Sequence, residues 1–436
     1  MSKYFGTDGI RGLYGETLTD NLAYLTGNAI AALKPGVKVI IGRDTRVSGE
    51  NLANSLIKGV LHGGGSVTDA GIIPTPTIAF STISTGADYG VVISASHNPP
   101  GYNGIKLFNS LGRKIPDSDK EFIEQRLSDN TATKGTSEGE LIDGAALSGA
   151  YIDKVVGQIG ISFKGYSVAL DCADGASYKT APEIFRRLGA TVYSYSDLGD
   201  GSVININKGA LHPAVIAGHT TGSKCDIGFA FDGDADRMIA CDSSGRIIDG
   251  DLVVYAVANY LKKRGRLKGD TAVGTHHTNM GMEQALLEKG IKLIRTKIGD
   301  QYVADEMIRN DYIIGGEQSG HIIMREFLET GDGIFAAALL MKIMVEEKQP
   351  INNLVNVNLM PQINSNIIVK DNVAAINDPG FQAACREAEA RINGKGRLLV
   401  RASGTEPKVR LMVESPDLLL AKSIVANLER VLKGNA

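Results

Sequence analysis

Short apolar segments alternate along most of the chain with segments whose hydrophobic residues recur at helical spacing. Val37–Ile41 and Ser66–Ile72 are apolar and bordered by glycine or proline turns, as strands are, and helical spacing covers Gly49–His62 between them. Because a strand, a helix and a strand follow one another in this order, we predict a parallel sheet. The same alternation starts again near Tyr166 and near Thr271. The other elements predicted in this part of the chain are strands at Tyr89–Ser94, Thr191–Tyr195 and Lys292–Thr296 and helices at Ala181–Leu188 and Met280–Lys289.

The alternating pattern is interrupted at two places and changes after Pro350. Ser128–Gly149 is polar and rich in glycine, serine and threonine, which predicts a linker or an excursion on the surface. Asp249–Leu252 closes the second unit and precedes an apolar helix predicted over Val253–Lys263. We therefore predict three similar α/β units with mixed or parallel sheets, over residues 1–150, 151–250 and 251–362, and a smaller α+β unit over 363–436. The last unit is predicted from strands at Asn366–Lys370, Arg397–Ala402 and Val409–Val413 and helices at Gly380–Ile392 and Leu418–Leu432.

Charge and hydropathy exclude several classes of protein. With 46 Lys and Arg against 49 Asp and Glu in 436 residues, the net charge of −3 gives no sign of nucleic-acid binding. The N-terminal sequence MSKYFGTDGIRG lacks the apolar core of a signal peptide, and no run of about 18 apolar residues predicts a membrane span. The longest apolar stretch, Ile334–Val345, is interrupted by Lys342 and predicts a buried helix.

The cysteines argue against a metal-binding or cross-linked scaffold. They lie far apart in the sequence and form no CxxC pair, which a zinc ribbon or a disulfide-rich domain would show. We therefore expect reduced thiols in a cytoplasmic protein. The four cysteines are Cys172, Cys225, Cys241 and Cys385.

A hydroxyl group follows one of the predicted strands. The segment VVISASHNPP runs from an apolar strand into Ser96 and His97, and Pro99 and Pro100 end the strand. Open α/β sheets bind ligands at the carboxyl ends of their strands, so Ser96 is a candidate nucleophile. We assign no Ser–His–Asp triad, because the side chains of adjacent residues are expected to point apart. Taken alone, the segment is also typical of an ordinary serine-rich turn.

Three aspartates at two-residue spacing follow another apolar strand. In IGFAFDGDADRMI the strand ends at Asp232, Asp234 and Asp236. These carboxylates would repel one another in a low dielectric, and a divalent cation that prefers oxygen ligands, such as Mg²⁺, would offset the repulsion. An EF-hand loop needs glycine at its sixth position and glutamate at its twelfth, which here are Arg237 and Ser243. We therefore predict a Mg²⁺ site. The alternative is a solvated acidic turn, but an apolar strand directly before the aspartates argues against a free surface loop.

A polar segment between two apolar runs offers groups that bind sugars. In IIGGEQSGHII, the residues Glu317, Ser319 and His321 alternate along the chain. On an extended strand they would all face one pocket, where they could bind sugar hydroxyls. A polar hairpin turn explains the segment equally well.

The segment LLVRASGTEPKVRLM has the features of a phosphate site. Ser403, Gly404 and Thr405 form a predicted turn between Arg401 and Arg410. Hydroxyls and backbone N–H groups in a glycine turn bind anions, and arginine adds a bidentate contact to phosphate. The chain has no GxxxxGK[ST] sequence, so this is not a P-loop. A basic surface turn is the alternative.

Together these segments predict phosphoryl transfer. Arg11, between glycines in FGTDGIRG, adds a cation that could reach a phosphate. The five segments then offer a nucleophile, a cation site, groups for sugar hydroxyls, a phosphate clamp and an extra arginine. Phosphoryl transfer to and from a sugar phosphate depends on positioning and charge neutralisation, which these groups supply.

The same five segments resemble the signature of the α-D-phosphohexomutases. FGTDGIRG, SASHNP with NGIK, DGDADR, GEQSGH and RASGTEPKVR occur in that family's order, from residue 5 to about residue 415. The resemblance implies four domains round a central cleft, three of one α/β type and a mobile fourth. GTDGIRG, GEQSGH and SGTEP are most similar to the members that interconvert glucosamine 6-phosphate and glucosamine 1-phosphate, on the route to UDP-N-acetylglucosamine and the bacterial cell wall. The alternatives are a sister enzyme for mannose or glucose phosphates and a non-catalytic sugar-phosphate-binding protein.

The resemblance also implies a role for each site residue. Ser96 is the expected phosphoserine, and a sugar 1,6-bisphosphate is the expected intermediate and activator. One oxygen of the Ser96 phosphate and Asp232, Asp234 and Asp236 are expected to bind Mg²⁺. Sugar binding is assigned to Glu317, Ser319 and His321, and the phosphate that does not react to Arg401, Ser403, Gly404, Thr405 and Arg410. The expected residues of the reaction centre are Ser96, Lys106, Arg11, Arg237 and His321, with Lys106 or His321 as acid and base.

The resemblance implies a small sugar phosphate as the partner, and neither a nucleic acid nor a membrane. It leaves open whether the chain forms a homodimer. The sequence departs from the family pattern at three places, none of which replaces the nucleophile or a metal ligand. Ala235 stands where many members have glycine, Lys208–Pro213 reads KGALHP instead of GSTHP, and Thr275–Gly281 reads THHTNMG instead of a segment ending in SNLG.

Overall fold

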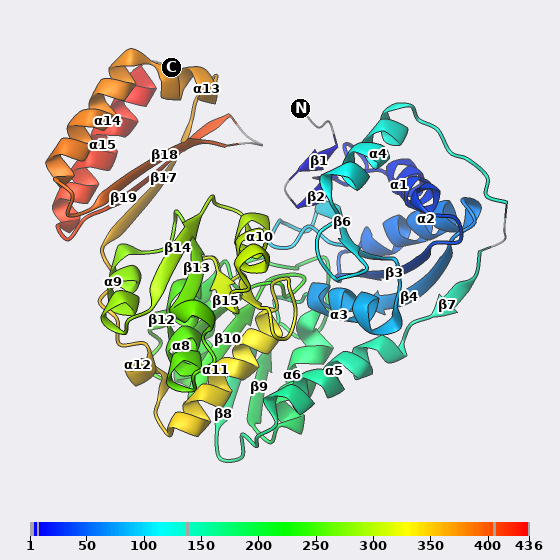
Figure 1. The fold of residues 1–436 in the computed structure, drawn as a ribbon, viewed down its shortest axis with the longest axis horizontal. Helices are drawn as coiled ribbons and strands as arrows, with labels where there is room; N and C mark the ends of the chain where they lie inside the picture. The colour runs from blue at the N-terminus through cyan, green and yellow to red at the C-terminus, as the bar shows by residue number, and fades with distance from the viewer. Residues whose placement is uncertain (1–3, 7, 137–138, 404–406, 435–436) are drawn as a thin grey trace. The chain divides into compact units, whose positions relative to one another are not determined.

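A computed structural model describes the chain except for residues 1–3, 7, 137–138, 404–406 and 435–436. The chain divides into two compact units (Figure 1). One consists of Met1–Thr275 and Thr296–Asn356, and the other of His276–Arg295 and Val357–Ala436. No helix in the described part of the chain has both the length and the apolar composition that a membrane span requires.

A seven-stranded sheet forms the N-terminal part of the first unit, in the order β1-β2-β6-β5-β3-β4-β7. Strands β3, β4, β5 and β7 run parallel, as the strand–helix–strand pattern predicts, whereas β6, β2 and β1 continue the sheet in antiparallel fashion. The strands are β1 (Phe5–Gly6), β2 (Gly9–Leu13), β3 (Lys38–Arg43), β4 (Ser66–Ile72), β5 (Tyr89–Ile93), β6 (Tyr102–Asn109) and β7 (Leu141–Asp143), and the helices are α1 (Asp20–Leu33), α2 (Gly49–His62), α3 (Thr75–Thr85) and α4 (Asp117–Ser128).

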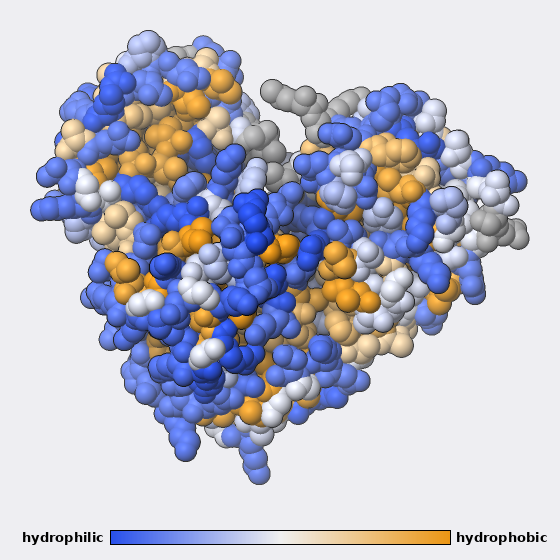
Figure 2. Space-filling view, in the orientation of Figure 1, coloured by the Kyte–Doolittle hydropathy of each residue, from blue (hydrophilic) through white to orange (hydrophobic). Residues whose placement is uncertain are grey.

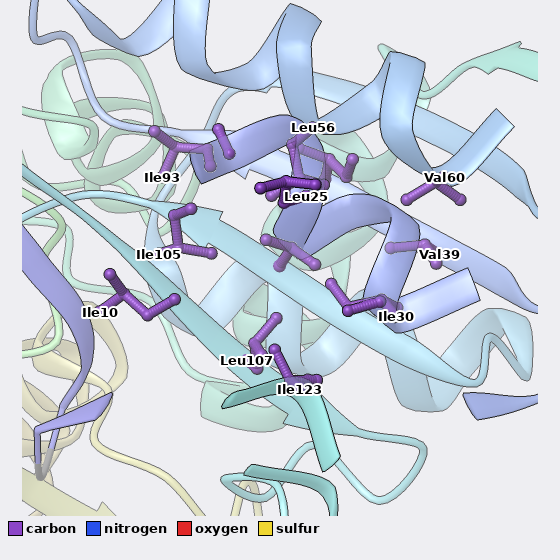
Figure 3. Packing of buried hydrophobic residues seen from close by; sticks show 14 of the residues in the cluster. Ile10, Leu25, Ile30, Val39, Leu56, Val60, Ile93, Ile105, Leu107 and Ile123 are labelled. Atoms are coloured by element: carbon purple, nitrogen blue, oxygen red, sulfur yellow. The ribbon is translucent and has the colours of Figure 1, made fainter. Parts of the chain in front are cut away.

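Alternate residues of β3 enter two different cores, because successive side chains of a strand point to opposite faces. Val39 and Ile41 belong to the core that includes Leu56 of α2, whereas Ile40 belongs to the core that includes Ile78 of α3. Figure 3 shows Val39 and Leu56 in the first core. Burial of each such side chain contributes about 1.5–3 kcal/mol to folding. The two cores fix the sheet whose strand ends carry the candidate nucleophile.

A second sheet follows, in the order β12-β11-β10-β8-β9. Strand β8 is parallel to β9 and β10, and β11 returns antiparallel to β10. The aspartate segment therefore becomes the turn between two adjacent buried strands. The elements are α5 (Ala146–Ile159), β8 (Ser167–Asp171), α6 (Ser177–Arg187), β9 (Thr191–Tyr195), α7 (Pro213–Gly222), β10 (Ile227–Phe231), β11 (Met238–Asp242) and β12 (Ile247–Ile248).

A third sheet has the order β14-β13-β15-β16, with β13 parallel to β15 and β15 antiparallel to β16. The predicted buried helix is confirmed, since 11 of the 15 residues of α11 are buried. The elements are α8 (Gly250–Lys263), a 3-10 turn (Lys268–Asp270), β13 (Thr271–Thr275), α9 (Met280–Glu288), β14 (Lys292–Thr296), α10 (Asp300–Asn310), β15 (Ile314–Gly316), β16 (Ile322–Met324), α11 (Gly333–Glu347) and α12 (Ile351–Leu354).

The second unit contains a three-stranded antiparallel sheet in the order β17-β19-β18. Helices α14 and α15 lie side by side (Figure 1), and their apolar residues share a core with the sheet. This confirms the smaller α+β fold predicted for the C-terminal part. The elements are β17 (Gln362–Ile368), α13 (Asn372–Asn377), α14 (Pro379–Ile392), β18 (Arg397–Ala402), β19 (Lys408–Glu414) and α15 (Leu418–Gly434).

The predicted polar linker contains more structure than its composition indicates. Within residues 128–149, β7 pairs in parallel with β4 at the edge of the first sheet, and α5 begins at Ala146. All three residues of β7 are exposed, so no hydrophobic pattern marks the strand.

Figure 2 shows hydrophilic residues over much of one face of the molecule, with hydrophobic residues between them in separate patches.

Candidate active site

Ser96 lies in the loop of residues 94–101, which joins β5 to the antiparallel β6. Its side chain is buried, and its hydroxyl donates a hydrogen bond to Asp232 Oδ2 at 2.6 Å. His97 Nδ1 lies 3.2 Å from the same hydroxyl. The prediction that the two adjacent side chains point apart is therefore wrong. Ser96 has a left-handed backbone, with φ of 52°, and this turn departs from the extended geometry on which the prediction depended.

His97 is nevertheless a poor base for Ser96. Burial and the positive charges of Arg237 and Arg11 lower the pKa of His97 to about 3. A base with so low a pKa takes up a proton poorly near neutral pH. The electrostatics of the site therefore agree with the interpretation that assigned no Ser–His–Asp triad.

A buried arginine holds the Ser96 loop, and sequence analysis did not identify it. Arg46 Nε donates to Asp44 Oδ2 at 2.9 Å, and Ser94 Oγ donates to the same carboxylate oxygen at 2.6 Å. The signal that could have found Arg46 is its place just after β3, at a strand end where α/β sheets bind ligands. The other N–H groups of Arg46 donate to the carbonyl oxygens of Ser96 at 3.0 Å, Asn98 at 2.7 Å, Tyr102 at 2.8 Å and Pro99, and Asn205 Nδ2 also donates to Ser96 O at 2.8 Å.

Replacing Arg46 with methionine is expected to lower the free energy of unfolding by about 3–5 kcal/mol, because Asp44 would remain as a buried charge without its cation. Neither side chain of this pair is exposed. Urea titration measures the change. Arg43→Met is the matched control: Arg43 is partly exposed and 3.9 Å from Glu50, so its loss is expected to cost less than about 1 kcal/mol. Equal stability losses in the two variants would contradict the assignment.

Asp232, Asp234 and Asp236 lie in the turn between β10 and β11. One carboxylate oxygen from each lies within 4.8 Å of the other two, and no other group of three acidic, histidine or cysteine residues in the described part of the chain comes together in this way. The Oδ1 atoms of Asp234 and Asp236 are buried and have no hydrogen-bond partner. Buried polar atoms are nearly always satisfied. A bound cation would satisfy these two.

The charges around the aspartates also fit a divalent cation. Burial, together with the Asp236 and Asp234 carboxylates, raises the pKa of Asp232 to about 8. Burial opposes the ionisation of Asp236 as well, but Lys106, His321 and Arg237 hold its pKa well below the ordinary value. A cation among the three carboxylates would offset their mutual repulsion. Because all the ligand atoms are oxygens, the site suits Mg²⁺.

Lys106 comes from β6 and bridges two of the aspartates. Its Nζ donates to Asp234 Oδ2 at 2.6 Å and to Asp236 Oδ2 at 2.9 Å. Burial disfavours the ammonium charge, but the Asp234 and Asp236 carboxylates raise the pKa of Lys106 above its ordinary value. Lys106 therefore carries a positive charge, and a proton that it can donate, beside the candidate cation site.

Arg237 and Arg11 add two further positive charges. Arg237 Nε lies 3.8 Å from Asp236 Oδ1, and the Asp236 and Asp232 carboxylates raise the pKa of Arg237 in spite of its burial. Arg11, on β2, donates from Nη2 to Asp8 Oδ2 at 3.2 Å. The Nε atoms of both arginines are buried and have no hydrogen-bond partner. Such donors suit an incoming anion.

Glu317, Ser319 and His321 lie in the turn between β15 and the antiparallel β16, so the interpretation as an extended strand is wrong and the alternative, a polar hairpin turn, is confirmed. The Glu317 N–H donates to His321 O at 3.0 Å, which closes the turn. Glu317 Oε1 accepts a hydrogen bond from the Gly299 N–H at 3.1 Å, and burial raises the pKa of Glu317. Ser319 is exposed, whereas His321 is buried. The turn, and not a strand face, brings Glu317 and His321 together.

His321 lies between two acidic residues. Its Nδ1 is 3.8 Å from Asp236 Oδ1, and its Nε2 is 3.6 Å from Asp300 Oδ2. The Gly331 N–H donates to Nε2 at 3.1 Å, which places the proton of the neutral ring on Nδ1. Burial disfavours the charged ring, but Asp236 and Asp300 raise the pKa of His321 above its ordinary value. The ring can therefore carry a proton next to the aspartates.

In the second unit, Arg401 on β18 and Arg410 on β19 are directly opposite each other. Like charges in this position repel, and a bound anion would offset the repulsion. Arg410 Nη2 donates to Ser403 Oγ at 3.5 Å. Both arginines line a cavity of about 160 Å³ with His277, whose pKa is lowered to about 4 by burial and by Arg401 and its arginine neighbours. Gly404 and Thr405, also predicted to bind phosphate, lie outside the described residues.

Sequence profiles of four domains of one family match the chain. They are described as phosphoglucomutase/phosphomannomutase alpha/beta/alpha domain I over residues 2–134, domain II over 149–245, domain III over 249–360 and the C-terminal domain over 354–431. These ranges follow the order of the predicted units, whose boundaries at residues 150, 250 and 362 stay predictions.

Curated relatives match over the full length. Phosphoglucosamine mutase from Moorella thermoacetica is 42% identical over 443 residues, with 100% of each chain covered. Phosphoglucosamine mutase from Clostridioides difficile is 41% identical over 444 residues, with 99% of each chain covered.

Solved structures share the fold. A phosphoglucomutase/phosphomannomutase family protein from Burkholderia thailandensis has a TM-score of 0.84 at 24% identity, with 98% of this chain and 97% of that chain covered. N-acetylphosphoglucosamine mutase from Aspergillus fumigatus, in complex with GlcNAc-6P and magnesium, has a TM-score of 0.66 at 17% identity, with 99% and 96% covered. The chain therefore belongs to the phosphoglucomutase/phosphomannomutase family, the α-D-phosphohexomutases, and is an intramolecular phosphotransferase of the isomerase class.

Proposed function

We propose that the chain interconverts glucosamine 6-phosphate and glucosamine 1-phosphate by exchanging a phosphoryl group between Ser96 and the sugar. The observation that carries the proposal is the 2.6 Å hydrogen bond from Ser96 to Asp232, which puts a buried hydroxyl against a cluster of three aspartates. Phosphoryl transfer depends on positioning and charge stabilisation, and this arrangement offers both. The full-length relatives named phosphoglucosamine mutase support the amino sugar as substrate.

The exchange has two steps. Phosphorylated Ser96 first gives its phosphoryl group to the free hydroxyl of the sugar monophosphate: the bond from phosphorus to Ser96 Oγ breaks, a bond to the sugar oxygen forms, and a base takes the hydroxyl proton. The product is a sugar 1,6-bisphosphate, which reverses its orientation in the site. In the second step a bond forms from Ser96 Oγ to the other phosphorus, the bond from that phosphorus to the sugar oxygen breaks, and an acid returns a proton to the sugar oxygen. Lys106 and His321 both lie against Asp236 and are the two candidates for the proton transfers.

We assign Mg²⁺ to Asp232, Asp234 and Asp236, together with an oxygen of the Ser96 phosphate. When bound, the ion would neutralise charge on the transferring phosphoryl group. The buried Oδ1 atoms of Asp234 and Asp236, which have no hydrogen-bond partner, support this assignment. Lys106, Arg11 and Arg237 add positive charge for the same group.

The rest of the substrate is assigned to two other sets of residues. Glu317 and Ser319 bind the hydroxyls of the sugar ring, and His321 borders both the ring and the reaction centre. The phosphate that is not reacting binds to the second unit. Because glucosamine 6-phosphate and glucosamine 1-phosphate present this phosphate from opposite ends, the clamp must accept either. The clamp consists of Arg401, Ser403, Gly404, Thr405 and Arg410.

Replacing Arg410 with glutamine is expected to raise KM about 10- to 100-fold for both monophosphates, because one charge-assisted hydrogen-bond pair to phosphate contributes about 1.5–3 kcal/mol. Steady-state kinetics in both directions measure the effect. Arg410→Lys keeps the charge and loses the bidentate geometry, so its KM should lie between the KM of the wild type and that of Arg410→Gln. A KM that rises for only one of the two monophosphates would contradict a shared clamp.

The physiological setting is also part of the proposal. We place the reaction in the cytoplasm, where its product supplies UDP-N-acetylglucosamine for the bacterial cell wall. In the structure all four cysteines are free thiols, as a reducing compartment maintains them.

A substrate comparison tests the proposed function. Rates are measured side by side on glucosamine 6-phosphate, glucose 6-phosphate and mannose 6-phosphate, with Mg²⁺ and the matching 1,6-bisphosphate. The proposal predicts the highest kcat/KM with glucosamine 6-phosphate. The second candidate is a phosphoglucomutase or phosphomannomutase, which the description of the family profiles favours; faster conversion of a neutral sugar would establish it and overturn the amino-sugar assignment.

A further inference from the structure

Lys114 joins two segments that are far apart in the sequence. It lies between β6 and α4, and its Nζ donates to Asp8 Oδ1 at 2.6 Å and to Asp300 Oδ1 at 2.7 Å. Asp8 belongs to the turn between β1 and β2, and Asp300 is the first residue of α10. All three side chains are largely buried, with 19%, 27% and 16% of their surfaces exposed. One ammonium group therefore serves two buried carboxylates.

Each of these carboxylates has a second neighbour, a basic residue, in the candidate active site. Asp8 Oδ2 accepts a hydrogen bond from Arg11 Nη2 at 3.2 Å. Asp300 Oδ2 lies 3.6 Å from His321 Nε2. Lys114 thus stands at the centre of a line of acidic and basic side chains, with Arg11 at one end and His321 at the other.

The charges of this line depend on one another. Burial opposes the ionisation of Asp8, but Lys114 and Arg11 hold its pKa below the ordinary value. Burial also disfavours the Lys114 ammonium, but Asp300 and Asp8 raise its pKa. Without the ammonium, Asp8 would keep Arg11 and Lys106 as basic neighbours, and Asp300 would keep His321. Each carboxylate would then pair more closely with its remaining neighbour, since an unpaired buried charge is costly.

We propose that Lys114 is a positioning residue for phosphoryl transfer, an inference that rests on the proposed function. By holding Asp8 and Asp300, it prevents these carboxylates from drawing Arg11 and His321 out of the arrangement that the transferring phosphoryl group requires. Misplacement of a reacting group by about 1 Å can lower a rate about 100-fold. Lys114 therefore acts on kcat through its neighbours.

Lys114→Met tests this inference, because methionine has a similar length and no charge. We expect kcat to fall about 10- to 100-fold with KM within about twofold of wild type. Lys114→Arg, which keeps the positive charge, is expected to recover at least about a third of the wild-type kcat. Lys34→Met is the matched control, since Lys34 makes a 2.6 Å ion pair with Asp88 and is 60% exposed; its kcat should be unchanged.

A rescue experiment separates positioning from a general effect on folding. Lys114 borders a cavity of about 350 Å³, which is also lined by Asp300 and His321. In Lys114→Ala, ethylammonium can enter the enlarged space and should raise kcat several-fold, whereas ethanol should not. A wild-type kcat in Lys114→Met would overturn the inference. The inference would also be overturned if the loss of activity came from a higher KM or a lower thermal stability, and if neither Lys114→Arg nor ethylammonium restored kcat.

The assay uses whichever hexose 6-phosphate the wild type converts fastest, so that the two proposals fail separately. Preference for a neutral sugar overturns the amino-sugar assignment and leaves Lys114 fully testable. An unaffected Lys114→Met enzyme overturns the positioning role and leaves the substrate assignment standing. If the wild type converts no hexose phosphate, both proposals fall.

Discussion

Replacing Ser96 with alanine is expected to lower the rate of interconversion by about 10⁴-fold or more, because the covalent route then has no acceptor. The residual arginines, Lys106 and the metal site still bind the sugar phosphate, so KM should change little. The rate is measured with either monophosphate in the presence of Mg²⁺ and the 1,6-bisphosphate. The bisphosphate is included because it would phosphorylate any other hydroxyl that could replace Ser96 as the phosphoryl carrier.

Ser110→Ala is the control for this experiment. Ser110 directly follows β6 and is exposed, so its loss should leave the rate at the wild-type level. Circular dichroism and thermal unfolding check that both variants fold. Interconversion by Ser96→Ala at a rate near that of Ser110→Ala would eliminate Ser96 as the phosphoryl carrier.

Removing the divalent cation is expected to lower turnover by about 10²–10⁴-fold, since an ion at this position stabilises the transferring charge by several kcal/mol. Asp234→Asn should have a loss in the same range. Asp234 Oδ2 already accepts hydrogen bonds from Lys106 and Thr75, so Oδ1 is the atom left for a cation. The measurement is kcat after chelation and after titration of Mg²⁺ back into wild type and variant.

Asp226→Asn is the matched control for the metal experiment. Asp226 precedes the opposite end of β10, is exposed and accepts hydrogen bonds from Ser167. Its amide variant should keep both the wild-type kcat and the wild-type Mg²⁺ requirement. Turnover that survives rigorous chelation in the wild type would refute a metal among the three aspartates.

Much of the fold follows from local patterns in the sequence. The helix over residues 49–62 and the strands over 66–72 and 191–195 have the predicted bounds, because their apolar residues recur with the period of the element that they form. β7 could not be predicted in this way, since its residues are exposed on both faces. Its position is set by pairing with β4, to which it is not adjacent in the sequence.

The candidate active site could likewise be predicted from the sequence only in part. Ser96, the three aspartates and Lys106 were predicted from motifs, and the structure brings them into contact. The backbone turn at Ser96, which puts His97 beside the hydroxyl, depends on a left-handed residue that no hydrophobic pattern reveals. Arg46 was missed for a related reason, because most of its partners are carbonyl oxygens about 50 residues away.

Glu317 and His321 were predicted as neighbours for the wrong reason. Their spacing suggested one face of a strand, whereas a turn between two short strands brings them together. Lys114 carried no motif at all. Two of its partners are 106 and 186 residues away in the sequence, so only the folded chain shows the line of acidic and basic side chains through it.

Peptide mapping by mass spectrometry tests most directly whether one side chain beside the aspartates carries the transferred group. Active protein is incubated with the 1,6-bisphosphate, digested and mapped, and a second sample is first treated with excess sugar monophosphate. We predict that the peptide containing Ser96 gains one phosphate in the first sample and loses it in the second. A phosphate on a different residue, or a Ser96 phosphate that the monophosphate does not remove, would contradict the mechanism.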